Sequence, residues 1–399
     1  MLAELKSKIE IRMQARFKTQ ANTAVHERLR LKVMFAVAIL KLFNFIGGAW
    51  DIQWHVEIGR DSLWIPPHLV VLFAFATGLA VTLAWIAYET YLARSGQPQP
   101  HSLRLGPLHA PGAAFGICLG YLLALLSGGL DELWHVIFGI DATLWSPPHL
   151  SIMLGTMVVD FSLMLGIAAS ARRLGYGFSL KSPLFWGLIL TGAYAFESVN
   201  FQMGEAFIVG YRHGGVGLYG LLFPILVGAF LPLSMIVLIR LAKRYWVLLV
   251  ALGLTLLLQY LATGIAAAGF AILKPVSVID EYVLQNPEST AAKAREFAGL
   301  LGFNGLIGFH QAWTMTLCFL PLALVASLEL IPNAPRYTLA AAPVFSISMV
   351  LFSYLSFQQT PALSNYPIAT LDLLLACGIS ALGGLLMGGL GMRLSSKVG

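Results

Sequence analysis

Ten apolar segments, separated by polar connections, dominate the chain. Each approaches the roughly 20 residues that a helix needs to cross a hydrocarbon core of ~30 Å. Backbone polar groups in lipid are satisfied inside helices, so this pattern predicts an all-α, polytopic transmembrane helical bundle of about ten spans. The predicted spans are 33–50, 69–93, 112–130, 150–170, 184–199, 218–239, 245–273, 306–330, 338–357 and 370–392.

The composition supports a membrane protein and leaves no room for a large soluble domain. Of the 399 residues, 58% are hydrophobic and only 11% are charged. The polar first 32 residues exclude a secretory signal peptide in this sequence, so we expect the first span to direct membrane insertion. Cys118, Cys318 and Cys377 lie in apolar runs without CxxC pairing, which indicates neither disulfides nor a thiolate metal site.

The charged residues divide between the two sides of the predicted bundle. The side that holds both termini carries 19 of the 25 lysines and arginines, and the other side carries twelve acidic residues. By the positive-inside rule both termini are cytoplasmic, in a multi-pass protein of the cell (plasma or inner) membrane. This distribution accounts for the net charge of +6 without a nucleic-acid partner.

The chain divides into three regions by composition. Residues 1–32 form a basic leader, which is either an interfacial helix on anionic lipid or a solvated segment. Residues 33–170 form a four-helix unit, and residues 171–399 form a six-span bundle. The outer loop 274–305 of that bundle is expected to contain a short amphipathic helix, which begins at a Ser-Thr cap and could act as a lid.

The four-helix unit contains an internal repeat. Residues 51–69 (DIQWHVEIGRDSLWIPPHL) and 131–150 (DELWHVIFGIDATLWSPPHL) align with one gap and are identical at twelve of nineteen positions. Both copies follow an odd-numbered span and precede an even-numbered one. The N-terminal half is therefore predicted to be a duplicated two-helix hairpin.

The repeated residues have the chemistry and spacing of metal ligands. Residues four apart share one face of a helix, and a Pro-Pro pair begins a helix well, so each hairpin can bring one carboxylate and two imidazoles together. Two histidines and a carboxylate suit Cu, Fe(II), Zn or Mn. The predicted metal ligands are Asp51, His55 and His68 in the first copy, and Asp131, His135 and His149 in the second.

A structural role for the repeat is the alternative. The histidines and aspartates would then cap helices at the membrane interface, and Trp54, Trp64, Trp134 and Trp145 would form an aromatic belt. The recurrence of all three ligand types favours the metal site over this alternative, whereas the tryptophans fit a belt or packing. Asp61 and Asp141 are interpreted as turn formers or as hydrogen-bond acceptors behind the ligand histidines.

The repeat resembles the C subunit of the copper membrane monooxygenases, the particulate methane and ammonia monooxygenases. That family carries Asp-x3-His-x12-His, matched by Asp51, His55 and His68, and Asn-x3-His-x13-His, matched in spacing by Asp131, His135 and His149. Asp131 stands where the family has Asn. The resemblance covers about residues 33–170 and implies copper, dioxygen, a small apolar substrate, further subunits and an electron donor.

Other polar residues lie near or within the predicted spans. Asp160, about 16 Å along its helix from His149, is interpreted as a helix-to-helix hydrogen bond, with an intramembrane proton path as the alternative. Glu197, Glu205, His213 and His310 crowd the outer side and are candidates to support or cover the metal site. The glycines of GGLLMGGLG (383–391) are predicted to allow close helix packing.

The leading hypothesis is a copper-dependent membrane monooxygenase that oxidises a small apolar molecule at the extracytoplasmic side. Iron, zinc and manganese remain alternatives to copper. Two other functions stay open: a membrane protein that captures or transports metal, and a membrane-embedded metal hydrolase with Glu57, Glu197 or Glu205 as base. The sequence contains no Walker, GxSxG, HExxH or dinucleotide-binding motif, and it assigns no catalytic residue.

Overall fold

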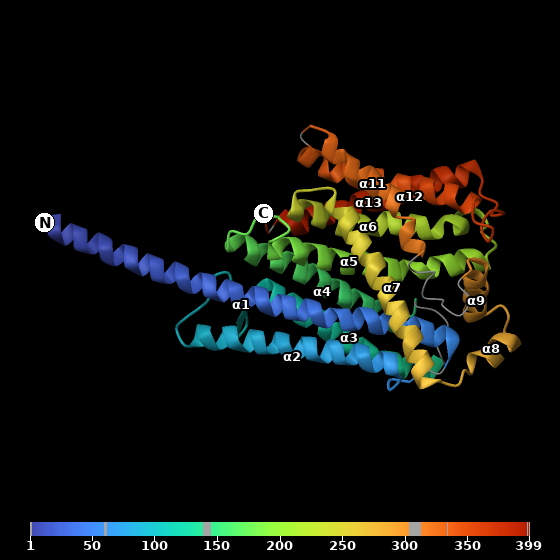
Figure 1. Cartoon of the computed structure of the whole chain (residues 1–399), viewed down its shortest axis with the longest axis horizontal. Coiled ribbons are helices and arrows are strands. Elements are labelled where there is room, and N and C mark those ends of the chain that lie inside the picture. Colours follow the sequence, from blue (N-terminus) through green and yellow to red (C-terminus); the bar gives the residue numbers. More distant parts are fainter. Residues whose placement is uncertain are drawn as a thin grey trace.

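The computed structural model describes residues 2–59, 62–138, 145–302, 313–332, 334–396 and 398, with side chains from residue 23 onward apart from Thr290 and 334–336. Within these ranges the chain is a bundle of long helices whose axes run along the longest dimension of the molecule (Figure 1). Nine helical segments of the described chain are long and apolar enough to cross a membrane. The prediction of an all-α membrane bundle is confirmed.

Helix α1 (Leu2–Glu57) is continuous over 56 residues and therefore includes both the predicted leader and the first span. The sequence predicted a connection over 51–68, and this was too long at both ends. Residues 51–57 complete α1, and α2 (Pro66–Arg94) begins at the Pro-Pro pair. The helix continues past Trp50 because no helix-breaking residue follows before Gly59, whose positive φ of 74° ends it.

The second hairpin has the same form. Helix α3 (Gly112–Phe138) and helix α4 (Pro147–Arg173) again extend into the predicted connection, here 131–149, and α4 also begins at a Pro-Pro pair. The two helices approach closely at Gly120 and Gly155, where a Cβ atom on either would lie within 2.6 Å of the other's carbonyl oxygen. Between the hairpins lies an antiparallel pair, β1 (Leu103–Leu105) and β2 (Leu108–Ala110), which the sequence did not predict.

Helix α5 (Pro183–Arg212) differs most from its prediction. The apolar pattern placed its end at residue 199, but the helix continues to Arg212, so Glu205 is helical and not part of a connection. Most of its residues are buried against α4, α6 and α7. Because its polar and acidic side chains lower its mean hydropathy, α5 is not among the nine apolar helices, although it occupies the place of the fifth predicted span.

The remaining helices form the rest of the bundle and one outer segment. After the 3-10 turn η1 (Gly217–Leu221) come α6 (Leu222–Ala242) and α7 (Val247–Leu273), then the short α8 (Ile279–Gln285) and α9 (Thr290–Leu300). The predicted Ser-Thr cap of α9 is confirmed, since Ser289 accepts a hydrogen bond from the Ala292 N–H. The chain ends with α11 (Phe319–Ser327), η2 (Leu328–Leu330), η3 (Ala334–Ala340), α12 (Ala341–Gln358) and α13 (Thr370–Ser396).

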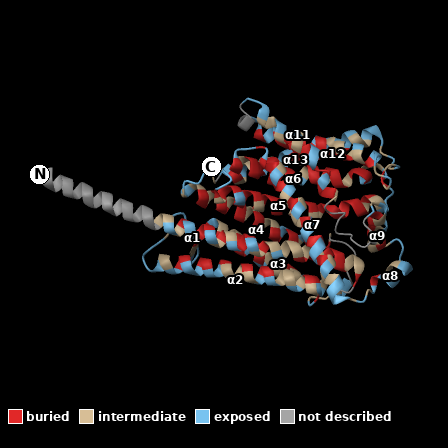
Figure 2. Ribbon diagram, viewed as in Figure 1, coloured by how far each residue is buried: buried red, intermediate tan, exposed pale blue. Residues whose placement is uncertain are grey.

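The buried core runs through the middle of the bundle, along α4, α5 and α6 (Figure 2). The glycines of α13 allow close packing, as predicted: a Cβ on Gly384 or Gly388 would clash with Ser346 or Ala342 of α12. Both ends of the chain lie toward the same end of the bundle, opposite to α8 and α9 (Figure 1). The two repeated sequences therefore turn at the end that faces away from the termini.

Candidate functional site

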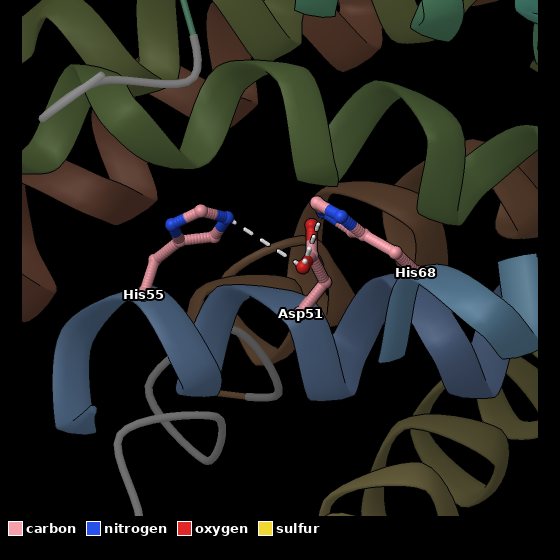
Figure 3. Close-up of side chains that lie close together, drawn as sticks. All are labelled: Asp51, His55 and His68. Atoms are coloured by element: carbon pink, nitrogen blue, oxygen red, sulfur yellow. Dashed lines mark ion pairs between the residues drawn. The ribbon is translucent and has the colours of Figure 1, made fainter. Parts of the chain in front are cut away.

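The first Asp-His-His set comes together at the end of α1 and the start of α2. Asp51 and His55 are one turn apart on α1, and His68 lies in the first turn of α2 (Figure 3). The Nε2 atoms of His68 and His55 lie 3.0 Å and 3.5 Å from Oδ1 of Asp51. One ligand atom from each residue can be chosen so that all lie within 4.8 Å of one another, a spacing that allows a shared metal ion.

The other ring nitrogen of His68 makes this arrangement chemically specific. Nδ1 lies 2.8 Å from the carbonyl oxygen of Ser62, which can only accept, so Nδ1 carries the proton. In a neutral ring Nε2 then presents a lone pair to the carboxylate of Asp51. Two acceptors at 3.0 Å repel each other unless a cation lies at them, either a ring proton or a metal ion. The donor set of the first copy therefore fits a metal.

The second set has the same arrangement with longer distances. His135 Nε2 lies 3.8 Å from Oδ1 of Asp131, and His149 Nε2 lies 3.5 Å from Oδ2. Nδ1 of His149 lies 3.0 Å from the hydroxyl of Ser146, the N-cap residue of α4. Because a hydroxyl can donate or accept, this contact orients the ring without fixing its tautomer. The predicted ligands of both copies are thus brought together, the first set more tightly.

The two sets are neighbours. The Leu63 N–H of the first hairpin donates to Oε2 of Glu132, which follows Asp131 on α3, over 3.1 Å. His149 is close enough to Asp51 for the two to interact electrostatically. Asp51, His68, Asp131 and His149 also line one cavity, while His55 and His135 lie one turn further along α1 and α3.

This cavity has a volume of about 150 Å³ and extends from the metal-ligand candidates into the bundle. On α1 its lining residues recur at intervals of three and four, from Lys41 to Asp51, which is about 15 Å along the helix. Most of the wall is apolar. The apolar lining includes Phe45, Val71, Leu72, Phe75, Ile152 and Phe201.

A buried polar cluster closes the inner end of the cavity. Lys41 Nζ lies 2.9 Å from Oδ1 of Asp160, and the Ser198 hydroxyl donates to Oδ2 over 2.7 Å. The interpretation of Asp160 as a helix-to-helix contact is borne out, since it joins α4 to α1 and α5; the proton path stays a prediction. The sequence analysis missed Lys41, although it is the only lysine or arginine inside the first predicted span.

A second group that the sequence did not reveal holds the outer end of α1. Arg295 of α9 donates from Nε to the Val56 carbonyl (2.8 Å) and from Nη2 to the Glu57 carbonyl (3.2 Å). The Ser277 hydroxyl also donates to the Glu57 carbonyl, and the Val278 N–H to the Ile58 carbonyl. The Val56 and Glu57 carbonyls are among those that a helix end leaves without partners, so Arg295 of α9 and Ser277, just before α8, cap the helix that carries His55.

The other predicted site residues are dispersed. Glu197 lines the cavity, whereas Glu205 lies two turns further along α5 and is not among the cavity's described lining residues. His213 caps the end of α5, stacks on Tyr219, and is not among the cavity's described lining residues. Asp61, Asp141 and His310 lie outside the described residues.

The repeated tryptophans have unlike environments. Trp54 is buried and stacks on Phe270 of α7, and the Trp145 indole donates to the Gln202 carbonyl of α5. Trp134 packs against Phe138, and only Trp64, at 72% exposure, is open. Two of them therefore tie the hairpins to the second half of the bundle.

Comparison of the chain with models of known protein families, with curated proteins and with solved structures finds no match in any of the three.

Proposed function

We propose that this chain is a metal-dependent membrane monooxygenase that oxidises a small apolar substrate with dioxygen. One observation carries the proposal: the aspartate and one histidine of each Asp-His-His set line a single, largely apolar cavity, and the second histidine of each set lies one turn further along its helix. Such a cavity offers a small apolar molecule a binding site beside the ligands. The spacing that the repeat shares with the copper membrane monooxygenases adds independent support.

Copper is the proposed metal, with iron, zinc and manganese as alternatives. Asp51, His55 and His68 would hold one ion, and Asp131, His135 and His149 a second, with coordination positions left for water or dioxygen. Bound copper would supply the one-electron steps that dioxygen reduction requires. The Ser62 carbonyl and the Ser146 hydroxyl orient the two helix-starting histidines, as outer partners of metal ligands commonly do.

The apolar part of the site binds substrate. The apolar walls of the cavity would take up a molecule that partitions into the bilayer, so access between helices suffices. Electrons would come from a separate donor of the hydroquinone class or from a redox partner. Further membrane or extracytoplasmic subunits are part of the proposal, since the resemblance covers only one subunit of an assembly.

The proposed orientation follows the charges. Both termini are placed in the cytoplasm and both ligand sets at the extracytoplasmic side of the cell membrane. The basic residues of the N-terminal segment belong to the chain end that lies opposite α8 and α9 (Figure 1), which supports this assignment.

The two alternatives have less support. A metal ion that moved inward from the ligands would meet the ammonium group of Lys41, which disfavours cation transport along this cavity. A hydrolase would need a base beside the metal, but Glu57 lies near Arg295 in a separate surface pocket with Lys274 and Asp280. Glu197 lies at the inner end of the cavity, beyond the ligand candidates, and Glu205 is not among the described residues that line it.

Metal analysis of the purified protein tests the proposal. The wild type is expected to hold about two equivalents of copper, and His55→Ala and His135→Ala are each expected to lose about one. His109→Ala in β2, remote from both sets, is the matched control and should keep both. A wild type without metal would refute the proposal, whereas zinc together with activity retained without dioxygen would favour the hydrolase.

A further inference from the structure

The inner end of the cavity holds a carboxyl group with an incomplete hydrogen-bond set. Glu197 is 7% exposed, and its side chain is hydrogen-bonded by Gln259 of α7. Within the described part of the chain, its Oε2 atom is buried and has no hydrogen-bond partner. A carboxylate in this position would leave a charged oxygen unsatisfied in an apolar setting, which is costly. A carboxylic acid could instead direct its O–H into the cavity.

The positive charge of Lys41, the basic residue nearest to Glu197 in the cavity lining, is neutralised by Asp160. Lys41 of α1 interacts electrostatically with Glu197 and would by itself favour a carboxylate there. Asp160 of α4 lies 2.9 Å from the ammonium group and neutralises it. The basic residues of α4 and α6 lie in the last turns of those helices, Arg172 and Arg173 in α4 and Arg240 in α6. In α9, Arg295 binds the end of α1 and Asp280, and Lys293 pairs with Glu288 and Glu296.

We propose that Glu197 holds an exchangeable proton and donates it into the cavity, and that Asp160 keeps it there by binding Lys41. This role rests on the proposed function. In a monooxygenation one oxygen atom enters a C–H bond and the other leaves as water, which takes up two electrons and two protons. A hydroquinone donor releases two of each. The Glu197 O–H bond breaks as its proton passes to water in the cavity, and this water relays a proton that forms an O–H bond on the departing oxygen atom at the outer end. The carboxylate then regains a proton released by the donor.

Infrared spectroscopy of the purified full chain tests this without any metal. The wild type should show a carbonyl-stretch band of a protonated carboxylic acid that moves to lower frequency in D2O. Glu197→Gln should remove the band, and Gln259→Leu should move it to higher frequency, because the carboxyl loses a hydrogen bond. Asp160→Asn should also remove it, since the uncompensated ammonium of Lys41 would take Glu197 as its counter-ion.

Glu296 provides the matched control. The Tyr211 hydroxyl donates to it over 2.6 Å and, with Lys293, holds the pKa of this exposed carboxyl below its usual range. Glu296→Gln should therefore leave the band unchanged. A wild type without the band, or with a band that D2O does not move, would overturn the proposal even if Glu197→Gln does not fold. A band that survives in Asp160→Asn would overturn the role of the ion pair.

Oxygen uptake with a hydroquinone donor separates this inference from the proposed function. Glu197→Gln should retain its copper and lower the uptake rate by roughly 100-fold or more, the usual effect of losing a general acid. Wild-type uptake by this variant would refute proton donation. If the wild type binds no copper and consumes no dioxygen, the proposed function fails, while the infrared result still decides whether Glu197 holds a proton.

Discussion

Arg295 donates a hydrogen bond from Nε to the carbonyl oxygen of Val56, 2.8 Å away, directly after His55 in the last turn of α1. Its Nη1 atom lies 2.6 Å from Asp280, which holds the guanidinium in place. His55, a proposed metal ligand, is thereby positioned by a residue 240 places later in the chain. The second half of the bundle takes part in forming the first ligand set.

Arg295→Gln should weaken metal binding at the first set and leave the second unchanged. The helix end would lose two donated hydrogen bonds, so His55 would be less well ordered. Loss of such an outer partner typically lowers metal affinity roughly 10-fold to 100-fold. Titration with Cu(II), followed by electron paramagnetic resonance, would resolve the two sites. Lys293→Gln on the same helix, which pairs only with Glu288 and Glu296 in the described structure, is the control. Equal weakening of both sites would contradict the assignment.

Ser146→Ala should affect both stability and the second ligand set. The hydroxyl caps α4 and contacts Nδ1 of His149, so we expect a loss of about 1 kcal/mol in the free energy of unfolding. Copper affinity at the second set should fall roughly 10-fold. Ser182→Ala removes the equivalent cap of α5, which binds only the Leu184 N–H, and should lower stability without changing copper affinity. The same metal loss in both variants would rule out a specific role for Ser146.

Replacing one residue of the buried pair Lys41 and Asp160 should lower the stability of the protein far more than replacing both together. Lys41→Met alone leaves an uncompensated carboxylate and should lower the free energy of unfolding by about 3–5 kcal/mol. The double variant Lys41→Met with Asp160→Leu should recover most of that loss. Thermal unfolding in detergent measures both. If the double variant is as unstable as the single one, the two charges do not act as a pair.

The close contact between Gly120 and Gly155 should not tolerate a side chain at either position. A Cβ on Gly155 would lie 2.6 Å from the Gly120 carbonyl oxygen, so Gly155→Ala should cost about 1–3 kcal/mol through overpacking. The substitution should also push α3 away from α4 and so weaken metal binding by Asp131 and His149. For Gly253 of α7, no other described part of the chain lies within 4 Å of an added Cβ. Gly253→Ala should raise stability by about 0.5–1 kcal/mol; a similar effect of both substitutions would exclude close packing as the cause.

The local geometry of the ligand sets could be predicted because it depends on short-range rules. A four-residue spacing places Asp51 and His55 on one helix face, and a Pro-Pro pair starts a helix before His68. Both rules act within a few residues of the sequence. The ends of the apolar runs were less informative, because polar residues such as Glu205 continue a helix when tertiary packing encloses them.

The contacts that complete the site depend on residues far apart in sequence. The ion pair of Lys41 and Asp160 joins two spans, and the sequence of neither span indicates which residue of the other it contacts. Arg295 was predicted to lie on the outer side, but its binding to the end of α1 depends on where α8 and α9 pack. Such contacts follow from the arrangement of the bundle, which hydrophobic periodicity does not determine.

The two copies of the repeat differ in what orients the histidine at the start of the second helix. In the first copy the partner is the main-chain carbonyl of Ser62, and in the second it is the side chain of Ser146. Any residue at position 62 supplies a main-chain carbonyl, so the first contact tolerates substitution of Ser62. A substitution at position 146 that removes the hydroxyl, such as Ser146→Ala, removes the second contact. Of the two proposed metal sites, the second is therefore the one whose histidine orientation depends on the identity of a single side chain.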